Sequence, residues 1–149
     1  MNGDQHPNAP IVKEVLLNAP VQKVWKAITD KDEMRHWYFK IESFEPEVGY
    51  EFHFYGEGHK GEQYLHRCRI TEVVVFKKLQ YTWSYENYQG LSTVTFELFE
   101  EGLQTRLRLT HEGLETFPDH SEDFAKESFN EGWTYLIEKS IREYLETSG

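Results

Sequence analysis

The sequence has little that could cross-link the chain or anchor it in a membrane. Of its 149 residues only one is a cysteine, Cys68, which excludes a disulfide within the chain and a cysteine-rich zinc site. The longest run of hydrophobic residues, at 73–76, is far too short to span a bilayer. Residues 1–10 are polar and lack the apolar stretch of a signal peptide. We therefore expect a disordered lead-in over 1–10, a cytoplasmic location and no membrane insertion.

Basic residues are also scarce. Lys and Arg number 16 against 26 Asp and Glu, which gives a net charge of −10. A field of that sign repels nucleic-acid phosphates and anionic lipid surfaces, so we expect no nucleic-acid partner. Aromatic residues, in contrast, are abundant, with 10 Phe, 9 Tyr and 4 Trp. Many of them must be buried in a core or line a pocket.

The hydrophobic pattern predicts a single α+β domain over residues 11–149. Residues 11–17 are typical of a strand, and two short helices follow, the first with apolar residues spaced i, i+3, i+4, i+7 from Val21. From Tyr38 the apolar period changes to two, which predicts an antiparallel meander. The six strands expected there are 38–45, 50–56, 62–74, 77–86, 91–99 and 103–111.

After Pro118 the helical period returns and predicts a long helix over about 119–146. Its apolar stripe includes Phe129, Trp133 and Ile137, and Glu and Lys occupy its other face. The expected sheet has seven strands and one apolar face, and this helix is the only element long enough to cross it. A curved sheet around one helix tends to leave a pocket between them.

Several short motifs, in their order along the chain, carry a family resemblance. They are Asn18-Ala19-Pro20 with Val24-Trp25, His36-Trp37-Tyr38, Val48-Gly49, Leu79 to Trp83, Ser92 to Thr95, Thr105 to Leu107 with Thr110 to Leu114, and Gly132-Trp133. Over residues 11–146 the chain resembles the START-like (SRPBCC) proteins of the Aha-type branch. These are homologues of the C-terminal domain of the activator of the ninety-kilodalton heat-shock chaperone's ATPase.

The resemblance implies a helix-grip fold with a hydrophobic cavity between sheet and C-terminal helix. It leaves three functions open: binding of a small hydrophobic or amphipathic molecule, a co-chaperone-like interaction with the heat-shock chaperone, and a cyclase- or hydratase-type enzyme. We favour the small apolar ligand, expect no cofactor, and leave a homodimer open.

Alternation along the expected strands selects the side chains that face the cavity. An apolar lining with a few orienting polar groups is typical of a ligand pocket. Tyr64, His66 and His111 are expected to orient the polar end of a ligand, and His66 to favour an acidic head group. The predicted ligand-binding residues are Trp37, Phe52, Phe54, Tyr64, His66, Trp83, Tyr85, His111, Phe129 and Trp133.

Each of these residues also has a simpler interpretation. The large aromatics suit an ordinary core, and His111 suits a structural histidine bonded to its neighbours. His66 and Cys68 lie two apart on one strand, but they have no third ligand at a recognisable metal spacing, and a buried cysteine is usually inert. We therefore predict neither a metal site nor a catalytic residue.

Overall fold

The six-stranded antiparallel sheet is the centre of the molecule. The structure, a computed structural model, describes residues 9–118 and 122–147, so most of the expected lead-in lies outside the described residues. The sheet order is β1-β6-β5-β4-β3-β2. Its strands are β1 (Ile11–Leu17), β2 (Glu51–Glu57), β3 (Gln63–Val74), β4 (Lys78–Tyr85), β5 (Ser92–Glu101) and β6 (Gln104–Glu112).

Alternation places one face of each strand in the core, as the sequence predicts. In β4, for example, Leu79, Tyr81, Trp83 and Tyr85 are buried, and the residues between them are partly exposed. Strands β2 to β6 are joined in sequence order, so they form a meander. The fold class is therefore the expected α+β helix grip, with one strand fewer than predicted.

The missing strand is the one expected over 38–45. Residues 38–45, all of which the structure describes, form an irregular segment that leads from the helices to β2. Its buried side chains, Ile41 and Phe44, lie three residues apart, a spacing that a regular strand would send to opposite faces. Phe44 packs edge-on against Phe52, with ring centroids 4.9 Å apart. The segment therefore fills the core without joining the sheet.

The two short helices between β1 and β2 are confirmed. Helix α1 (Val21–Thr29) follows Pro20, and helix α2 (Lys31–Trp37) begins after Asp30, whose side chain accepts a hydrogen bond from the Asp32 amide. Trp25 is buried on the inner face of α1, as its position in the apolar stripe predicts. Its ring meets Phe76, in the turn between β3 and β4, edge to face at 6.4 Å.

The C-terminal helix contains a wide π-helical turn. It runs through α3 (Lys126–Trp133), a π-helical segment η4 (Thr134–Ser140) and α4 (Ile141–Thr147). It starts at Lys126, later than the predicted residue 119, and a short 3₁₀ turn, η3 (Glu122–Phe124), precedes it. The first predicted helix residues, 119–121, lie outside the described residues. A second 3₁₀ turn, η2 (Leu114–Thr116), follows β6.

The π turn has a cause in the sequence. The fully inward residues recur every fourth position: Phe129, Trp133, Ile137, Ile141 and Leu145. An α-helix has 3.6 residues per turn, so a strict four-residue stripe drifts by about 40° at each repeat. The wider π turn compensates for that drift. One face of the helix therefore stays against the sheet along its whole length.

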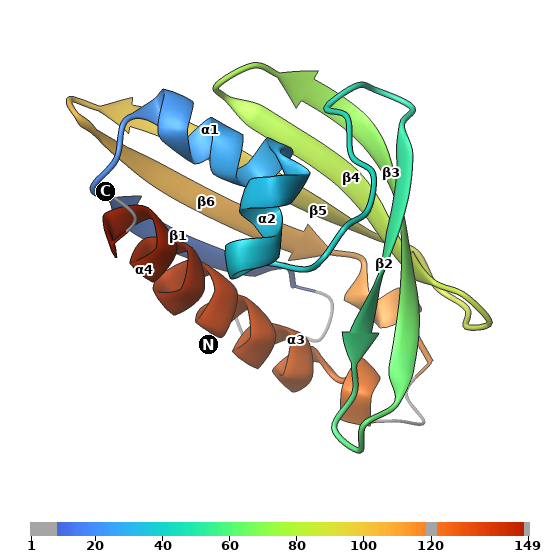
Figure 1. The fold of residues 1–149 in the computed structure, drawn as a ribbon. Coiled ribbons are helices and arrows are strands. Elements are labelled where there is room, and N and C mark those ends of the chain that lie inside the picture. Colours follow the sequence, from blue (N-terminus) through green and yellow to red (C-terminus); the bar gives the residue numbers. More distant parts are fainter. Residues whose placement is uncertain (1–8, 119–121, 148–149) are drawn as a thin grey trace.

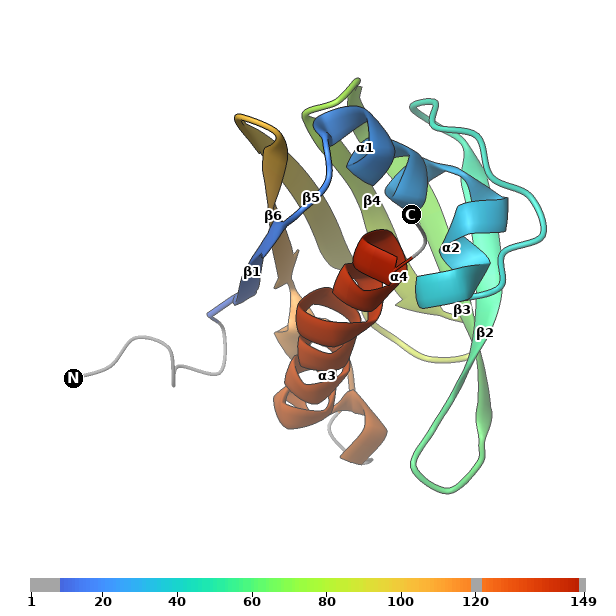
Figure 2. The ribbon, with the colours of Figure 1, turned by 60° about the vertical axis from the view of Figure 1, so that its left-hand side comes forward.

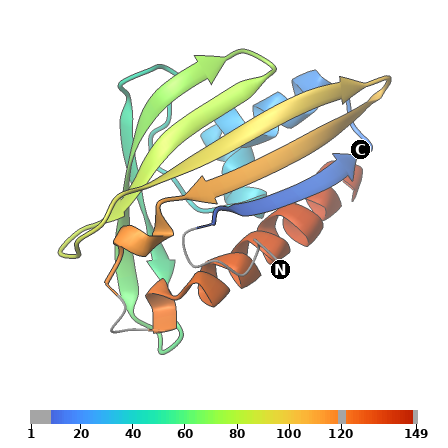
Figure 3. The same ribbon diagram turned by 180° about the vertical axis from the view of Figure 1, so that it is seen from behind.

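The helices lie together on the concave face of the sheet. Figures 1 and 2 show α1 and α2 beside the end of the long helix that carries α4, while α3 extends alone toward the tip of the β2–β3 hairpin. In the view from behind, no helix of the described residues covers the opposite face of the sheet (Figure 3). Within the described part of the chain, no helix is both long and apolar enough to cross a bilayer.

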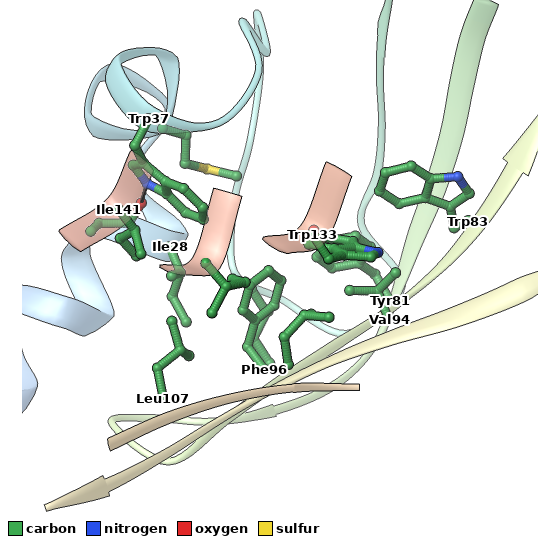
Figure 4. Close-up of a cluster of buried hydrophobic side chains, with 14 of the residues drawn as sticks. Ile28, Trp37, Tyr81, Trp83, Val94, Phe96, Leu107, Trp133 and Ile141 are labelled. Carbon is green, nitrogen blue, oxygen red and sulfur yellow. Dashed lines mark hydrogen bonds between the residues drawn. The ribbon is translucent and has the colours of Figure 1, made fainter. Parts of the chain in front are cut away.

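The core between these layers is continuous. Figure 4 shows Trp37 and Ile141 on the helical side facing Leu107 and Phe96 from the sheet. Trp133 and Trp83 close the other end of the same cluster. That second end borders the candidate site.

Candidate functional site

A cavity of about 450 Å³ lies between α3 and the β2–β3–β4 part of the sheet. Its size falls within the usual range for small-molecule pockets. Its wall is largely aromatic, with a few polar groups at one side. The lining residues are Phe39, Gly56, Glu57, Gly58, His59, Tyr64, His66, Trp83, Tyr85, Asp123, Phe124, Ser128, Phe129, Glu131, Gly132, Trp133 and Leu136.

Six of the ten predicted residues line this cavity: Tyr64, His66, Trp83, Tyr85, Phe129 and Trp133. Alternation brings the first four together, because β3 and β4 are paired and each sends every second side chain inward. The other two come from α3 one helical turn apart. Trp83 and Trp133 meet across the gap between sheet and helix, with ring centroids 5.8 Å apart.

His66 forms part of the wall as a neutral ring. It stacks on Phe54 with centroids 4.5 Å apart, and its Nδ1–H donates to the Tyr64 carbonyl at 3.1 Å. Burial lowers the pKa of His66 to about 4, and hydrogen bonds to the Tyr64 and Phe54 backbone oppose that shift only in part. At neutral pH the ring therefore carries no positive charge. The expected preference of His66 for an acidic head group loses its physical basis.

The ring of His66 needs the glycine beneath it. A Cβ on Gly56 would lie 2.6 Å from Cε1 of the ring, closer than two non-bonded carbon atoms can approach. Gly56 pairs with Tyr64 in the sheet, so it stands directly beside the cavity. The missing side chain at this position is what lets an imidazole lie flat against β2.

His111 holds a hydrogen-bond chain behind the cavity. Trp133 Nε1–H donates to His111 Nδ1 at 2.9 Å, so Nε2 carries the proton and donates to Ser92 Oγ at 2.7 Å. The serine hydroxyl in turn donates to the Trp83 carbonyl at 3.0 Å. Burial lowers the pKa of His111 to about 3. The neutral histidine fixes the Trp133 indole in the cavity wall and does not line the cavity.

The other three predicted residues that do not line the cavity have structural contacts. Trp37 lies at the far end of the core and donates its Nε1–H to the Ala27 carbonyl at 2.7 Å. Phe54 lies behind the wall, stacked between Phe39 and His66, with centroids 4.4 Å from the former ring. Phe52 packs beside Tyr81, deeper in the core. Phe52 and Phe54 point into the core, as alternation along their strand predicts, but all three residues lie outside the cavity lining.

The mouth of the cavity contains a polar cluster that the sequence analysis missed. The Asp123 carboxylate accepts one hydrogen bond from the Tyr64 hydroxyl at 2.6 Å and another from the His59 backbone amide at 2.8 Å. The His59 Nε2 atom lies 2.8 Å from Ser128 Oγ and 3.7 Å from the Asp123 carboxylate. These contacts join the β2–β3 hairpin to η3 and α3. Phe39 was missed as well, because it falls in the segment wrongly predicted as a strand.

The chemistry of these groups favours binding by contact and hydrogen bonding. Trp83 Nε1–H donates to Tyr85 Oη at 2.9 Å, and burial raises the pKa of Tyr85, so its hydroxyl keeps a proton to donate. Burial also raises the pKa of the Cys68 thiol, which therefore stays protonated and a poor nucleophile. Among the described residues, no group of three or more His, Cys, Asp and Glu could hold a metal ion.

Comparison with known proteins agrees with the geometry. The fold is that of the START-like superfamily, as the resemblance predicted. The chain belongs to the family described as Activator of Hsp90 ATPase homolog 1-like protein, whose model matches residues 18–146. No protein of curated function matches the sequence at a significant level.

Solved structures share the fold across the whole domain. CV1439 from Chromobacterium violaceum is 21% identical with a TM-score of 0.77, and the match covers 95% of this chain and 99% of that one. BH1534 from Bacillus halodurans is 28% identical with a TM-score of 0.70, covering 91% and 96%. DynU16, a putative protein in the dynemicin biosynthetic locus, is 20% identical with a TM-score of 0.75. That match covers 95% of this chain but 49% of DynU16, so the chain spans about half of its length.

Proposed function

We propose that the protein binds a small molecule with a flat, largely apolar body in the cavity between α3 and the sheet. The observation that carries the proposal is the wall itself: Trp83 and Trp133 meet across it, and Phe39, Tyr64, Tyr85 and Phe129 complete it. Trp, Tyr and Phe side chains bury large apolar areas and pack well against other flat rings. A ligand that buries about 300 Å² of apolar surface gains roughly 7 kcal/mol from burial, before the entropy cost of binding. Ring-to-ring contacts and hydrogen bonds in the cavity add to this gain, and we expect a net affinity in the micromolar range.

The experiment is a binding screen with neutral aromatic compounds, starting with N-phenyl-1-naphthylamine, whose fluorescence rises in an apolar environment. We expect a micromolar Kd for the wild-type chain. Leu136→Trp puts a larger side chain into the cavity and should weaken binding at least tenfold. Its matched control is Tyr135→Trp, because Tyr135 is the neighbouring helix residue, is 57% exposed and does not line the cavity.

Two results would contradict the proposal. The first is no binding by any compound of the screen, which would make the aromatic wall an ordinary core surface. The second is equal affinity of the Leu136→Trp and Tyr135→Trp variants, which would place the bound dye elsewhere on the protein. Trp83→Phe provides a check on location, since it should remove part of the change in tryptophan fluorescence upon binding.

The family description supports a second candidate, a co-chaperone-like interaction with the heat-shock chaperone. It rests on that description and on no surface of the structure. We expect no strong stimulation of the chaperone ATPase by this chain alone. A several-fold stimulation at stoichiometric concentration, together with co-precipitation of the two proteins, would put this candidate ahead of ligand binding. The third candidate, an enzyme of the cyclase or hydratase type, has weaker support: polar side chains gather at the mouth of the cavity, and the rest of the wall is largely aromatic.

A further inference from the structure

Two polar groups in the aromatic wall have hydrogen-bonding capacity that the described chain does not use. They are the Nε2 atom of His66 and the hydroxyl proton of Tyr85, and both side chains line the cavity. Each is more than nine-tenths buried, with His66 6% exposed and Tyr85 8% exposed. The two residues are direct partners in the pairing of β3 with β4, and their ring centroids lie 4.6 Å apart. They therefore form one small polar area in a wall that is otherwise largely aromatic.

The Nε2 atom of His66 is a hydrogen-bond acceptor without a donor. The proton of the neutral ring is on Nδ1, because Nδ1 faces the Tyr64 carbonyl at 3.1 Å, so Nε2 keeps its lone pair. Within the described chain this is the one hydrogen bond of the ring, yet no polar side-chain atom there is both fully enclosed and without a partner. Nε2 is therefore open to space, and the space that His66 borders is the cavity.

The Tyr85 hydroxyl is a donor without an acceptor. Its oxygen accepts the Trp83 indole N–H at 2.9 Å, which occupies a lone pair and leaves the hydroxyl proton unused. Among the described residues this hydroxyl makes no second hydrogen bond. Trp83 and Tyr85 lie two positions apart on the inward face of β4. The indole thus holds the hydroxyl oxygen in the wall, and the proton is available to a ligand.

We infer that the ligand of this cavity carries a neutral hydroxyl group on its flat apolar body, and that this hydroxyl donates to His66 Nε2 and accepts from the Tyr85 hydroxyl. The inference rests on the proposed function, since it specifies the ligand of the same cavity. A hydroxyl has one proton to donate and two lone pairs, so it can satisfy both groups.

Other polar groups satisfy only one side of this pair. A carboxylate accepts from Tyr85 but has no proton to donate to His66 Nε2, and an ether has the same defect. An ammonium group donates to Nε2 but cannot accept from Tyr85. A purely apolar ligand would cover both groups and leave them without partners, which costs affinity. The pair therefore selects for a ligand group that both donates and accepts.

Three naphthalene probes of nearly equal size test the inference: 2-naphthol, 2-methoxynaphthalene and 2-methylnaphthalene. The first donates and accepts, the second only accepts, and the third does neither. Their Kd values are measured at pH 7 by displacement of N-phenyl-1-naphthylamine. Two ratios are then compared between variants: the Kd of the ether over that of the naphthol, and the Kd of the methyl compound over that of the ether. The solvation of each probe in water is the same throughout, so it cancels in this comparison.

Each variant removes one side of the pair. His66→Phe keeps a flat ring against Gly56 but has no acceptor, so the first ratio should fall about tenfold. Tyr85→Phe removes only the hydroxyl, so the second ratio should fall about tenfold. The two variants act independently, and if one did not fold the other would still decide.

The matched control is Tyr81→Phe. Tyr81 lies on the same inward face of β4, is completely buried and does not line the cavity. Its hydroxyl is hydrogen-bonded to that of Tyr38 at 2.7 Å, so this variant also deletes a buried hydroxyl with a partner. Both Kd ratios should stay at their wild-type values.

The outcomes separate the two proposals. If the dye does not bind to the wild-type chain, the proposed function is wrong and the hydroxyl inference falls with it. If the dye binds but 2-naphthol does not displace it, or if His66→Phe and Tyr85→Phe keep both wild-type ratios, the hydroxyl inference is wrong and ligand binding stands. The inference is also wrong if the ratios fall equally in Tyr81→Phe, because the preference would then come from the core as a whole.

Discussion

The space between the sheet and the C-terminal helix has two ends that are built differently. At one end α1 and α2 pack beside α4, and Ile28, Trp37 and Ile141 are almost completely buried. At the other end α3 faces the sheet without those helices, and the cavity opens there (Figure 1). The comparison teaches that abundant aromatic residues do not by themselves make a pocket. The pocket forms where the helical layer is reduced to one helix.

Among the variants that test this comparison, we expect the largest effect from Trp37→Ala at the closed end. Trp37 is 2% exposed and its indole hydrogen bond to Ala27 would be lost, so the free energy of unfolding should fall by about 3–5 kcal/mol. Phe39→Ala, at the open end, should cost roughly half as much, because Phe39 is only partly buried and borders the cavity. Urea unfolding of both variants measures the difference. Equal losses would mean that the two ends are packed alike.

A pair of glycines that both line the cavity gives a smaller effect. Gly56→Ala should destabilise the protein by about 1–3 kcal/mol and weaken dye binding, because the new methyl group would displace the His66 ring. Gly132→Ala should instead stabilise it by up to about 1 kcal/mol, because Gly132 lies in α3 with open space where the Cβ would be. Thermal unfolding of the two variants distinguishes them. A neutral effect of Gly56→Ala on stability would mean that the His66 ring does not lie against Gly56.

The smallest effect is the pH dependence of the buried histidines. In the folded state the pKa is about 4 for His66 and about 3 for His111, against an ordinary value of 6.5. As the pH falls below 6.5 the unfolded chain takes up these protons first, so stability decreases until the folded-state pKa is reached. From pH 7 to 5.5 each histidine should account for about 1 kcal/mol of lost stability.

Carboxylates also titrate at acid pH, so a variant is needed to isolate the contribution of one histidine to the slope of stability against pH. His66→Gln should remove about half of the histidine contribution to the slope between pH 7 and 5.5. An unchanged slope in His66→Gln would show that the ring is solvated in the folded protein.

Much of the fold could be predicted because strand alternation is a local property. Along most of β2, β3, β4, β5 and β6 buried side chains alternate with exposed or partly exposed ones, and the printed sequence shows that pattern directly. The segment 38–45 misled the prediction because the residues at its start, Tyr38 and Phe39, favour a strand by composition. There Ile41 and Phe44 are buried, and Phe44 packs against Phe52 of the strand that follows. The pattern of such a segment is decided only when the rest of the core is present.

The candidate site also contains residues that could be predicted from the sequence and residues that could not. Its wall on β3 and β4 could be predicted, since Tyr64, His66, Trp83 and Tyr85 lie at alternating positions. Asp123 could not be predicted, because one acid among 26 acidic residues carries no local signal, and its hydrogen-bond partner Tyr64 lies 59 residues earlier. The role of His111 in holding Trp133 depends likewise on a contact between a strand and a helix.

The pairing of β1 with β6 determines when the sheet can be completed during synthesis. Ile11 pairs with His111, a hundred residues further along the chain. On the ribosome β1 is made first and must wait for a partner that emerges last among the strands, while the meander from β2 to β5 can form without it. The helix that completes the cavity follows later still. The cavity wall is therefore incomplete until α3 has been made, so a nascent chain that stops short of α3 lacks the space proposed for the ligand.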